Sequence, residues 1–211
     1  DNNTNNEVGT VEFKNVGFKY PDGEDYVLKD ISFKANKGET VAFIGSTGSG
    51  KSTLINLVPR FYDATNGEVL VNGTSVKEYT EEGLRNKIGI VPQKAVLFKG
   101  TIRSNLLWGN ESATENDLME ALKQAQSYDF VMQKENGIDS VVEQNGRNFS
   151  GGQRQRLTIA RALVRKPEIL ILDDSSSALD YTTDANLRKE IAKLKDMTVF
   201  IVSQRTASIM D

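Results

Sequence analysis

The chain has 211 residues, of which 38% are hydrophobic and 26% are charged, and this composition suits one globular domain with a substantial core. Its formal net charge of −3 provides no general basic excess for binding nucleic acid, although a local basic patch remains compatible with it. The sequence has no cysteine and no histidine, which excludes disulfides, thiolate metal sites and catalysis by a histidine base.

The first part of the chain predicts a linker followed by three strands. Residues 1–9 are polar and rich in asparagine, which indicates a linker or the cut end of a longer protein. Alternating and apolar patterns predict strands that are separated by short turns, at residues 10–20, 27–35 and 40–44. The third strand is continuously apolar, so we expect both of its faces to be buried. A Gly/Ser-rich loop and a helix ending near Val58 follow, and Pro59 stops that helix.

The remainder predicts a helical segment between further strands. A hairpin turn at Asn72-Gly73 interrupts a strand-like segment at 66–76. A short helix near 81–86, a strand at 88–91, and later strands at 169–173 and 198–202 with a helix between them complete the β-rich parts. From about residue 94 to 165 the pattern is helical, at 101–107, 114–126 and 150–165, without a convincing strand. This order favours a parallel-sheet α/β core with an inserted helical lobe.

Three further features limit the class of protein. The longest apolar runs, at residues 41–44 and 169–172, are far shorter than the ~20 residues that span a bilayer. No segment resembles a signal peptide, and no internal repeat is visible. The chain stops at Asp211 where a helical pattern begins, which indicates truncation rather than a natural terminus.

A phosphate-binding loop is predicted between the strand at 40–44 and the following helix. The segment GSTGSGKST fits the pattern G-x-x-x-x-G-K-[ST] in the strand–loop–helix context that the pattern requires. Its glycines let backbone N–H groups face a phosphate, Lys51 can reach the β- and γ-phosphates, and the Ser52 hydroxyl can bind Mg²⁺. An ordinary Gly/Ser turn is the alternative. The candidate ATP-binding residues here are Gly45, Ser46, Thr47, Gly48, Ser49, Gly50, Lys51, Ser52 and Thr53.

Two adjacent carboxylates end the apolar strand at 169–173. Because neighbouring side chains on a strand point to opposite sides, Asp173 and Asp174 cannot share one task. Asp173 is placed to be the second Mg²⁺ anchor of a phosphate-loop site, although a carboxylate that caps a loop is the alternative. Asp174 then falls where a hydrolytic water would lie and could act as its base.

The segment FSGGQRQRLTIARAL at 149–163 completes an ordered set of motifs that resembles the nucleotide-binding domain of an ABC transporter. The resemblance runs from about residue 10 to the end, with Phe149 in place of the usual leucine of the signature. It implies a P-loop NTPase (RecA-like) core, an antiparallel β subdomain and an inserted helical subdomain at about 94–165. Residues 10–211 would then be a C-terminally truncated nucleotide-binding domain, and 1–9 a linker from an upstream transmembrane domain.

The signature residues lie at the predicted start of a helix, where exposed N–H groups can bind a phosphate. The resemblance implies that they bind the γ-phosphate of ATP held by a second nucleotide-binding domain, so that two domains enclose two ATP molecules. A capped core helix that binds nothing is the alternative. The residues concerned are Ser150, Gly151, Gly152 and Gln153.

The resemblance assigns roles to three further residues. Tyr20 would stack on adenine, although an aromatic residue at a strand end is more often part of a core. Gln93 would contact Mg²⁺ or water and signal to the membrane domains, and Asp180 would reach across the dimer. Residues 141–148 would contact the coupling helices of transmembrane domains. The segments at 60–69 and 91–106 are similar to those of exporters.

Two residues depart from the family pattern in the same catalytic role. Asp174 replaces the glutamate that follows the Mg²⁺-binding aspartate, and Gln204 replaces a histidine. An aspartate carboxylate reaches about 1–1.5 Å less than that of glutamate, and a misplacement of ~1 Å can cost on the order of 10²-fold in rate. Glutamine also cannot carry a proton near neutral pH. We therefore hypothesise a site that binds MgATP and hydrolyses it weakly, as in the degenerate-site subunit of bacterial heterodimeric ABC exporters.

The expected cofactors are ATP and Mg²⁺, and the expected activity is a transport-coupled ATPase at the cytoplasmic face of the cell membrane. The expected partners are a second nucleotide-binding domain on a different chain and transmembrane domains, with no nucleic acid. One alternative is a fully active homodimeric ABC ATPase with Asp174 as base; another is neutral drift at both positions. An ABC-fold ATPase of DNA repair or translation would need a long insertion, and the stretch at 94–149 is too short for one.

Overall fold

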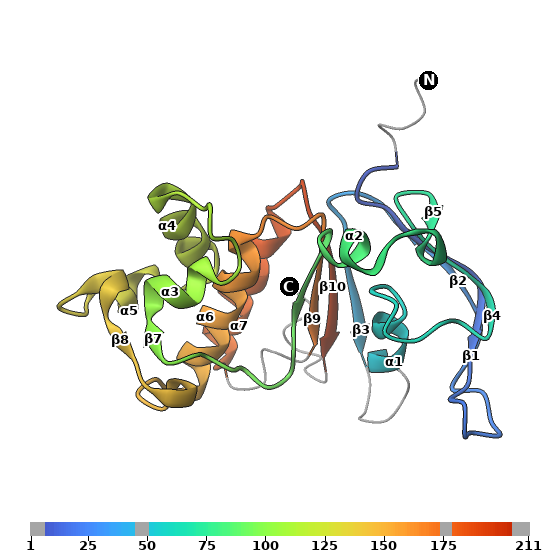
Figure 1. The fold of residues 1–211 in the computed structure, drawn as a ribbon, viewed down its shortest axis with the longest axis horizontal. Helices are drawn as coiled ribbons and strands as arrows, with labels where there is room; N and C mark the ends of the chain where they lie inside the picture. Colours follow the sequence, from blue (N-terminus) through green and yellow to red (C-terminus); the bar gives the residue numbers. More distant parts are fainter. Residues whose placement is uncertain (1–6, 45–50, 174–178, 204–211) are drawn as a thin grey trace. The chain divides into compact units, whose positions relative to one another are not determined.

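The computed structural model describes residues 7–44, 51–173 and 179–203, and these form two compact units (Figure 1). The first unit comprises Asp1–Ile88, Glu168–Ile171 and Lys195–Gln204. The second comprises Gly89–Pro167, Leu172–Leu194 and Arg205–Asp211. Each unit is described by itself below.

The first unit contains an antiparallel sheet with the strand order β2-β1-β4-β5. Its strands are β1 (Val11–Phe18), β2 (Leu28–Ala35), β4 (Asn66–Val71) and β5 (Thr74–Ser75). Strand β1 is central, because Val11 pairs with Ala35 of β2 on one side and with Val71 of β4 on the other. The antiparallel β subdomain predicted from sequence is therefore confirmed.

The Asn72-Gly73 turn between β4 and β5 is also confirmed. Asn72 has a φ of 54° and Gly73 a φ of 78°, the two positive values that a type I′ hairpin turn requires. After Ser75 the chain enters a 3₁₀ turn at Val76–Glu78 and then the short helix α2 (Glu81–Arg85), which Thr80 caps. The expected strand thus ends one residue before Val76.

A second sheet has the strand order β3-β10-β9-β6, with β3 (Thr40–Ile44), β6 (Ile88–Val91), β9 (Ile169–Asp173) and β10 (Thr198–Ser203). Strands β3 and β10 are parallel, with Val199 paired to Thr40. The expectation that both faces of β3 are buried is wrong, because Val41, Ala42 and Phe43 are half-buried. Strand β3 is at the edge of the sheet, whereas β9 has a neighbour on each side and its first four residues are buried.

Aromatic rings join these two sheets in the core of the first unit. Phe13 stacks on Phe33 of the antiparallel sheet with 4.7 Å between ring centroids. Phe33 then meets Phe43 of β3 at 5.9 Å, and Phe43 stacks on Phe200 of β10 at 6.1 Å. Aromatic pairs of this kind stabilise a core by about 0.5–1.5 kcal/mol each beyond the area that they bury. The antiparallel sheet and the strands β3 and β10 of this unit are thus joined by a series of aromatic contacts.

The second unit is mainly helical, as expected. Its helices are α3 (Ile102–Leu107), α4 (Glu115–Gln124), α5 (Tyr128–Met132), α6 (Gly151–Val164) and α7 (Tyr181–Ala192). Helix α6 packs against α3 and α4, and α4 packs against α7. The buried face of α6 includes Leu157, Ala160, Leu163 and Val164, at the helical spacing seen in the sequence.

One expectation for this unit is wrong, since it contains a short antiparallel ladder. Strand β7 (Gly100–Thr101) pairs with β8 (Val141–Val142), and Gly100 lies opposite Val142. Strands of two residues carry no recognisable alternation, so a sequence pattern cannot reveal them.

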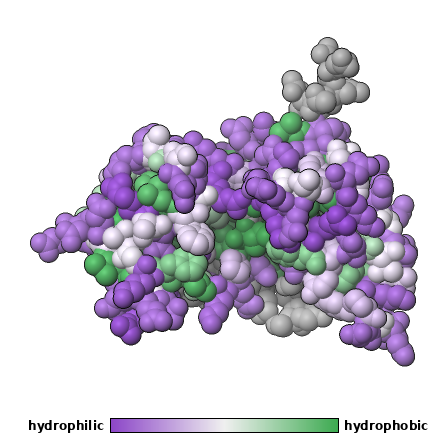
Figure 2. All heavy atoms as spheres, in the orientation of Figure 1, coloured by the Kyte–Doolittle hydropathy of each residue, from purple (hydrophilic) through white to green (hydrophobic). Residues whose placement is uncertain are grey.

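Within the described residues, the longest apolar helices fall short of what a membrane crossing requires. Hydrophilic side chains dominate the face shown in Figure 2, and hydrophobic ones form small patches on it. Among the large hydrophobic residues that the structure describes, Trp108 is the most exposed, at 71%, and its ring lies 5.0 Å from that of Phe98.

Candidate functional site

The predicted phosphate loop lies between β3 and α1 (Lys51–Asn56). Residues 45–50, which include Gly45 and Gly50, are outside the described residues, as are the side chains of Lys51 and Ser52. The flanking strand and helix are present as expected, which supplies the local context of a phosphate-binding loop. Thr53, the last residue of the motif, is buried in the first turn of α1.

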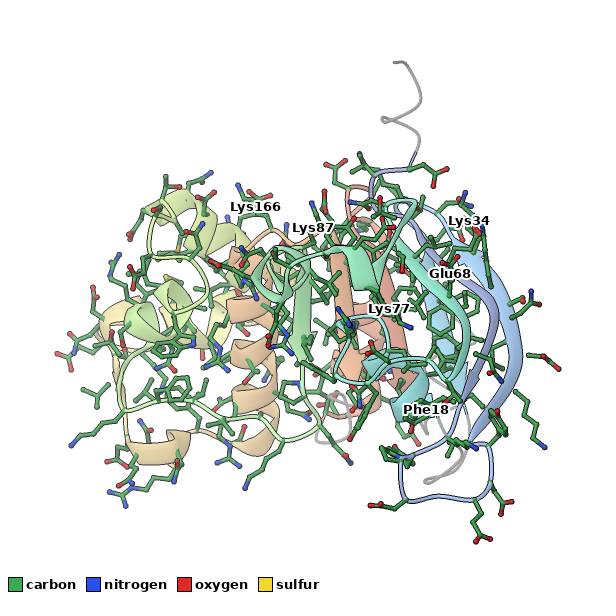
Figure 3. All side chains as sticks on the ribbon, turned by 45° about the vertical axis from the view of Figure 1, so that its right-hand side comes forward. Phe18, Lys34, Glu68, Lys77, Lys87 and Lys166 are labelled. Atoms are coloured by element: carbon green, nitrogen blue, oxygen red, sulfur yellow. The ribbon has the colours of Figure 1, made fainter. Side chains whose placement is uncertain are left out.

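Tyr20 lies against this helix. It follows the end of β1 by two residues, and its carbonyl accepts a hydrogen bond of 2.9 Å from Gly23 N in the next turn. The Tyr20 hydroxyl and Thr53 Oγ1 are 2.8 Å apart and share a hydrogen bond. Two aromatic rings meet the Tyr20 ring edge-on. The Phe18 ring, labelled in Figure 3, has its centroid 4.9 Å from that of Tyr20, and the Tyr62 ring has its centroid 5.4 Å from it. Tyr20 as a whole residue is 37% exposed, so these contacts cover it only in part.

The signature segment forms the start of α6, as predicted. Ser150 is the N-cap, and its Oγ accepts a hydrogen bond of 3.1 Å from Gln153 N. Gln153 Oε1 accepts one of 3.0 Å from Ser150 N, which completes a capping box. Ser150 is exposed, Gly151 and Gly152 are half-buried, and the first turn contains no acidic residue. These features suit the helix start to an anionic group.

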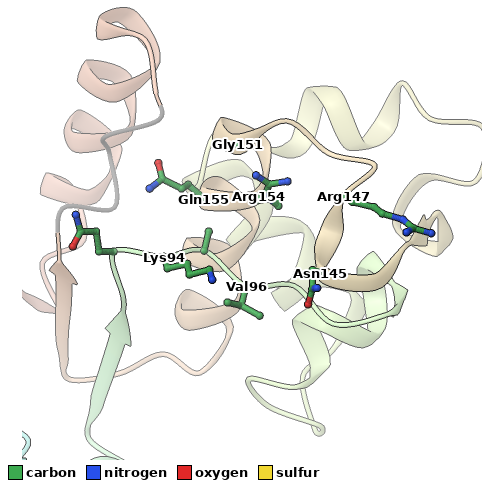
Figure 4. Close-up of a pocket in the computed structure, with 9 residues that line it drawn as sticks. Lys94, Val96, Asn145, Arg147, Gly151, Arg154 and Gln155 are labelled. Carbon is green, nitrogen blue, oxygen red and sulfur yellow. The ribbon is translucent and has the colours of Figure 1, made fainter.

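A pocket of about 500 Å³ lies beside the start of α6, and Figure 4 labels Gly151 among its lining residues. Its walls come from the segment after β6, the segment before α6 and the first two turns of α6, with the lining residues Gln93, Lys94, Ala95, Val96, Asn145, Arg147, Gly151, Arg154 and Gln155. Three of these are cations, and the Arg147 guanidinium is 3.2 Å from the Glu143 carboxylate. The charged residues that line the pocket are therefore all cations, among polar and apolar neighbours.

Two candidate carboxylates lie at the end of a strand and at the start of a helix. Asp173 is the last residue of β9 and is half-buried, whereas the four apolar residues before it are buried. Asp180 is the N-cap of α7, and its Oδ1 accepts a hydrogen bond of 2.7 Å from Thr183 N. Asp174 and Gln204, the two residues that depart from the family pattern, are outside the described residues.

Sequence reasoning missed Arg156, which connects several elements near Asp180. Its guanidinium donates to the carbonyl oxygen of Gln126 at 2.8 Å and to that of Gly152 at 3.3 Å, and it lies 4.8 Å from the centre of the Phe130 ring. Burial lowers the pKa of Arg156, and the negative charge of Asp180 opposes that shift. Nothing in the helical period of α6 distinguishes this arginine, because its contacts outside the helix, Gln126 and Phe130, are far away in the chain.

Asn105 is a second residue that the sequence did not reveal. It is buried on α3, donates to the carbonyl oxygens of Phe98 and Thr101, and accepts a hydrogen bond of 2.8 Å from Phe98 N. These bonds hold residues Phe98 and Thr101, which lie between β6 and α3, against the start of α3. A buried polar residue in an otherwise apolar helical face was the available signal.

Comparisons with known proteins agree with these observations. The family model described as ABC transporter matches residues 28–177. The chain is 46% identical over 202 residues to YfiB of Bacillus subtilis (strain 168), an uncharacterized ABC transporter ATP-binding protein. The aligned region covers 96% of this chain and 35% of YfiB. It is 45% identical, with 95% and 35% covered, to a Staphylococcus aureus (strain Mu50) protein whose name provisionally assigns it to multidrug export as an ATP-binding/permease protein.

A solved structure shares the fold. It is described as the structure of a bacterial Atm1-family ABC exporter with ATP bound, and it matches with a TM-score of 0.87 and 37% identity. The match covers 96% of this chain and 36% of that one, so the chain spans about a third of the length of the proteins that it matches. The predicted fold class, a P-loop NTPase core with an antiparallel sheet and a helical part, is confirmed.

Proposed function

Since the chain belongs to the ABC transporter family and has the fold of its ATP-binding domain, we propose that it binds MgATP and drives export through transmembrane domains. The observation that carries this proposal is the contact of Tyr20 with Thr53. This contact supports a base-stacking role for Tyr20, because it holds the side chain beside the helix that follows the predicted phosphate loop. The exporter relatives support the direction of transport.

The candidate residues divide the tasks of ATP binding. Lys51 and the backbone of Gly45–Gly50 would hold the phosphates, and Ser52 and Asp173 would hold Mg²⁺. Bound Mg²⁺ neutralises charge on the phosphates and orients them for attack by water. Gln93 would contact this metal or the water. The half-buried position of Asp173 at the end of a buried strand supports its role, since such a strand fixes where a carboxylate stands.

We further propose that the start of α6 serves a second nucleotide-binding domain. Ser150, Gly151 and Gly152 would bind the γ-phosphate of ATP on the partner, with Gln153 holding the serine through the capping box. Asp180 would contribute to communication between the two sites. The absence of an acidic residue from the first turn of this helix supports the role, because the N–H groups at a helix start attract an anion.

The chain's own site would bind MgATP and hydrolyse it slowly. This proposal rests on Asp174, whose carboxylate is shorter than that of glutamate, and on Gln204, which cannot carry a proton. The intact signature would serve an active site formed with a different chain. The competing possibility is a homodimer in which Asp174 acts as base.

Transmembrane domains would contact the second unit at the cytoplasmic face of the membrane. The cationic pocket next to Gln93 and the segment 141–148 support this, as does the exposed Trp108 beside Phe98. Exposed aromatic side chains of this size are typical of surfaces that a partner covers.

ATP hydrolysis by the full chain tests the proposal. MgATP should bind to the chain. Its kcat for ATP hydrolysis should remain well below about 1 s⁻¹, the lower end of typical kcat values. The double variant Asp174→Glu, Gln204→His should increase the rate by on the order of 10²-fold. The matched control, Asp174→Asn with Gln204→Asn, should give no increase.

Two results would contradict parts of this proposal. Absence of MgATP binding would overturn the assignment as an ATP-binding domain. Ordinary turnover by the unmodified chain alone would instead support the homodimer with Asp174 as base and end the weak-hydrolysis proposal.

A further inference from the structure

The ring of Phe149 lies directly before the start of α6 and has a cation on its face. Phe149 precedes the N-cap Ser150 and is buried, at 4% exposure. The Lys134 ammonium lies over the ring, 4.7 Å from its centroid. The face of an aromatic ring attracts a cation at this distance, and the attraction is stronger where water is excluded. The leucine that is usual at this place of the signature offers no such face.

Lys134 is held in place by its own backbone. Its N–H donates to the Val131 carbonyl oxygen of α5 at 3.1 Å, and its carbonyl oxygen accepts a hydrogen bond of 3.1 Å from Gly137 N. The residue is half-buried, and the ion pairs of the described residues in this unit do not include it. The Phe149 ring is therefore the partner that the described part of the chain offers to this ammonium.

The backbone of Phe149 leads directly into the capping box of α6. Its N–H donates to the Gly146 carbonyl oxygen at 3.0 Å, and its own carbonyl oxygen accepts a hydrogen bond of 3.2 Å from the Arg154 guanidinium. Because the peptide bond to Ser150 is planar, the position of Phe149 limits where the Ser150 N–H can lie. That N–H donates to Gln153 Oε1 in the capping box. A cation that fixes the ring thus also restricts the start of the helix.

We propose that Lys134 is a positioning residue for the start of α6, and that it acts through the Phe149 ring to keep the capping box of Ser150 and Gln153 closed. The purpose of this positioning rests on the proposed function, because a helix start that is ordered before a phosphate arrives binds it at a smaller entropic cost. The positioning itself concerns contacts within this chain. It can therefore be measured without ATP and without a partner.

Amide hydrogen exchange of full-chain variants, followed by NMR, tests this inference. The reporters are the Ser150 and Gln153 amides, since both donate a hydrogen bond within the capping box. The variants form a double-mutant cycle. Lys134→Met keeps an unbranched side chain and removes the charge, Phe149→Leu removes the ring, and the double variant removes both. Lys134→Arg is the conservative variant, because it keeps a cation.

Two controls separate this effect from a general loss of stability. The Ala125 amide donates to the Ala121 carbonyl oxygen at the end of α4, where exchange occurs through local opening of the helix end, and Lys134→Met should leave its exchange unchanged. Lys19→Met removes a cation of the same kind in the first unit, where Lys19 Nζ lies 5.4 Å from the centroid of the Tyr26 ring. It should leave both reporters unchanged.

The contact between ammonium and ring predicts a specific pattern. Lys134→Met should accelerate the exchange of both reporters by about two- to fivefold, as expected for the loss of a partly exposed cation–π contact. In the Phe149→Leu background the same substitution should have no effect, because no ring remains. Lys134→Arg should exchange like the unmodified chain, since a guanidinium also binds the face of a ring.

Other patterns would overturn the inference. Equal acceleration by Lys134→Met with and without the Phe149 ring would show that the ammonium acts by another route. Acceleration of the Ala125 amide by the same factor would show that Lys134 stabilises the unit as a whole. If Phe149→Leu does not fold, Lys134→Met and Lys134→Arg decide, because unchanged exchange in the first or equal acceleration in both rejects the inference. Failure of the unmodified chain to bind MgATP would reject the proposed function, which is a separate result.

Discussion

Ser150 and Gln153 hydrogen-bond each other reciprocally at the start of α6: Ser150 Oγ accepts from Gln153 N at 3.1 Å, and Gln153 Oε1 accepts from Ser150 N at 3.0 Å. The serine and the glutamine of the signature therefore have a local structural role before any ligand is considered. The capped-helix interpretation of the motif and the phosphate-binding one are compatible, because the cap uses the N–H of Gln153 and the N–H groups of Gly151 and Gly152 have no partner within the helix.

This capping box predicts a measurable loss of stability. Ser150→Ala should lower the free energy of unfolding by about 1 kcal/mol, since it removes the acceptor of the N-cap bond. Gln153→Ala should lower it by a smaller amount, and Gln153→Glu should preserve it, because glutamate can accept the same bond. Urea denaturation followed by circular dichroism measures all three. Equal stability of Ser150→Ala and the unmodified chain would contradict the assigned cap.

Arg156 should matter more for stability than a surface arginine does. Arg156→Met loses the hydrogen bonds to Gln126 and Gly152 and the contact with the Phe130 ring, and we expect it to lower the free energy of unfolding by about 1.5–3 kcal/mol. The control is Arg147→Met, whose side chain is 73% exposed and pairs with Glu143 one turn away, with an expected effect below about 0.5 kcal/mol. Chemical denaturation measures the free energy of unfolding of both variants. Similar decreases in the two would show that the contacts of Arg156 between elements do not stabilise the protein.

Asp117 predicts a dependence of stability on pH. The hydrogen bond from the Thr114 backbone N–H at the start of α4, followed by the Lys166 ammonium, lowers the pKa of Asp117 from 3.8 to about 2. Because the folded-state pKa is below the unfolded one, the contribution of the carboxylate is fully present above about pH 4 and is lost as the pH falls toward 2. The stability difference between the unmodified chain and Asp117→Asn should therefore be constant above pH 4 and decrease below it. Denaturation curves between about pH 2.5 and 6 measure this stability difference in the range set by the two pKa values. A difference that grows on acidification would refute the lowered pKa of Asp117.

Gly67 predicts a backbone effect at the start of β4. Its φ is +76°, and a Cβ at this position would lie 2.3 Å from the carbonyl oxygens of Lys14 and Asn15 on β1. Gly67→Ala should thus destabilise the protein by more than about 2 kcal/mol, through strain and a contact that the sheet cannot relieve. Gly23→Ala is the matched control, since its Cβ would meet Tyr20 at an ordinary 3.4 Å, and its effect should be below about 0.5 kcal/mol. Thermal unfolding of the two variants measures the loss of stability. A loss for Gly67→Ala as small as that for Gly23→Ala would mean that β1 and β4 can move apart at this position.

The sequence by itself determined the features that depend on neighbouring residues. The hairpin at Asn72-Gly73 follows from two residues that tolerate positive φ, and α6 follows from Ser150, its glutamine three residues later and a 3.6-residue apolar period. The ordered motifs also identified the family, because the residues of each motif are neighbours in the chain. The order of strands and helices in the chain then predicted the fold class.

Tertiary structure decided the features that depend on residues far apart in the chain. The bond between Tyr20 and Thr53 and the one between Arg156 and Gln126 each join residues some thirty positions apart. The pairing of β7 with β8 and the half-burial of β3 depend on which element becomes the neighbour of another in space. No local pattern encodes such neighbours, because a side chain's burial and partners are set by the folded arrangement of several elements and not by the propensity of its own segment.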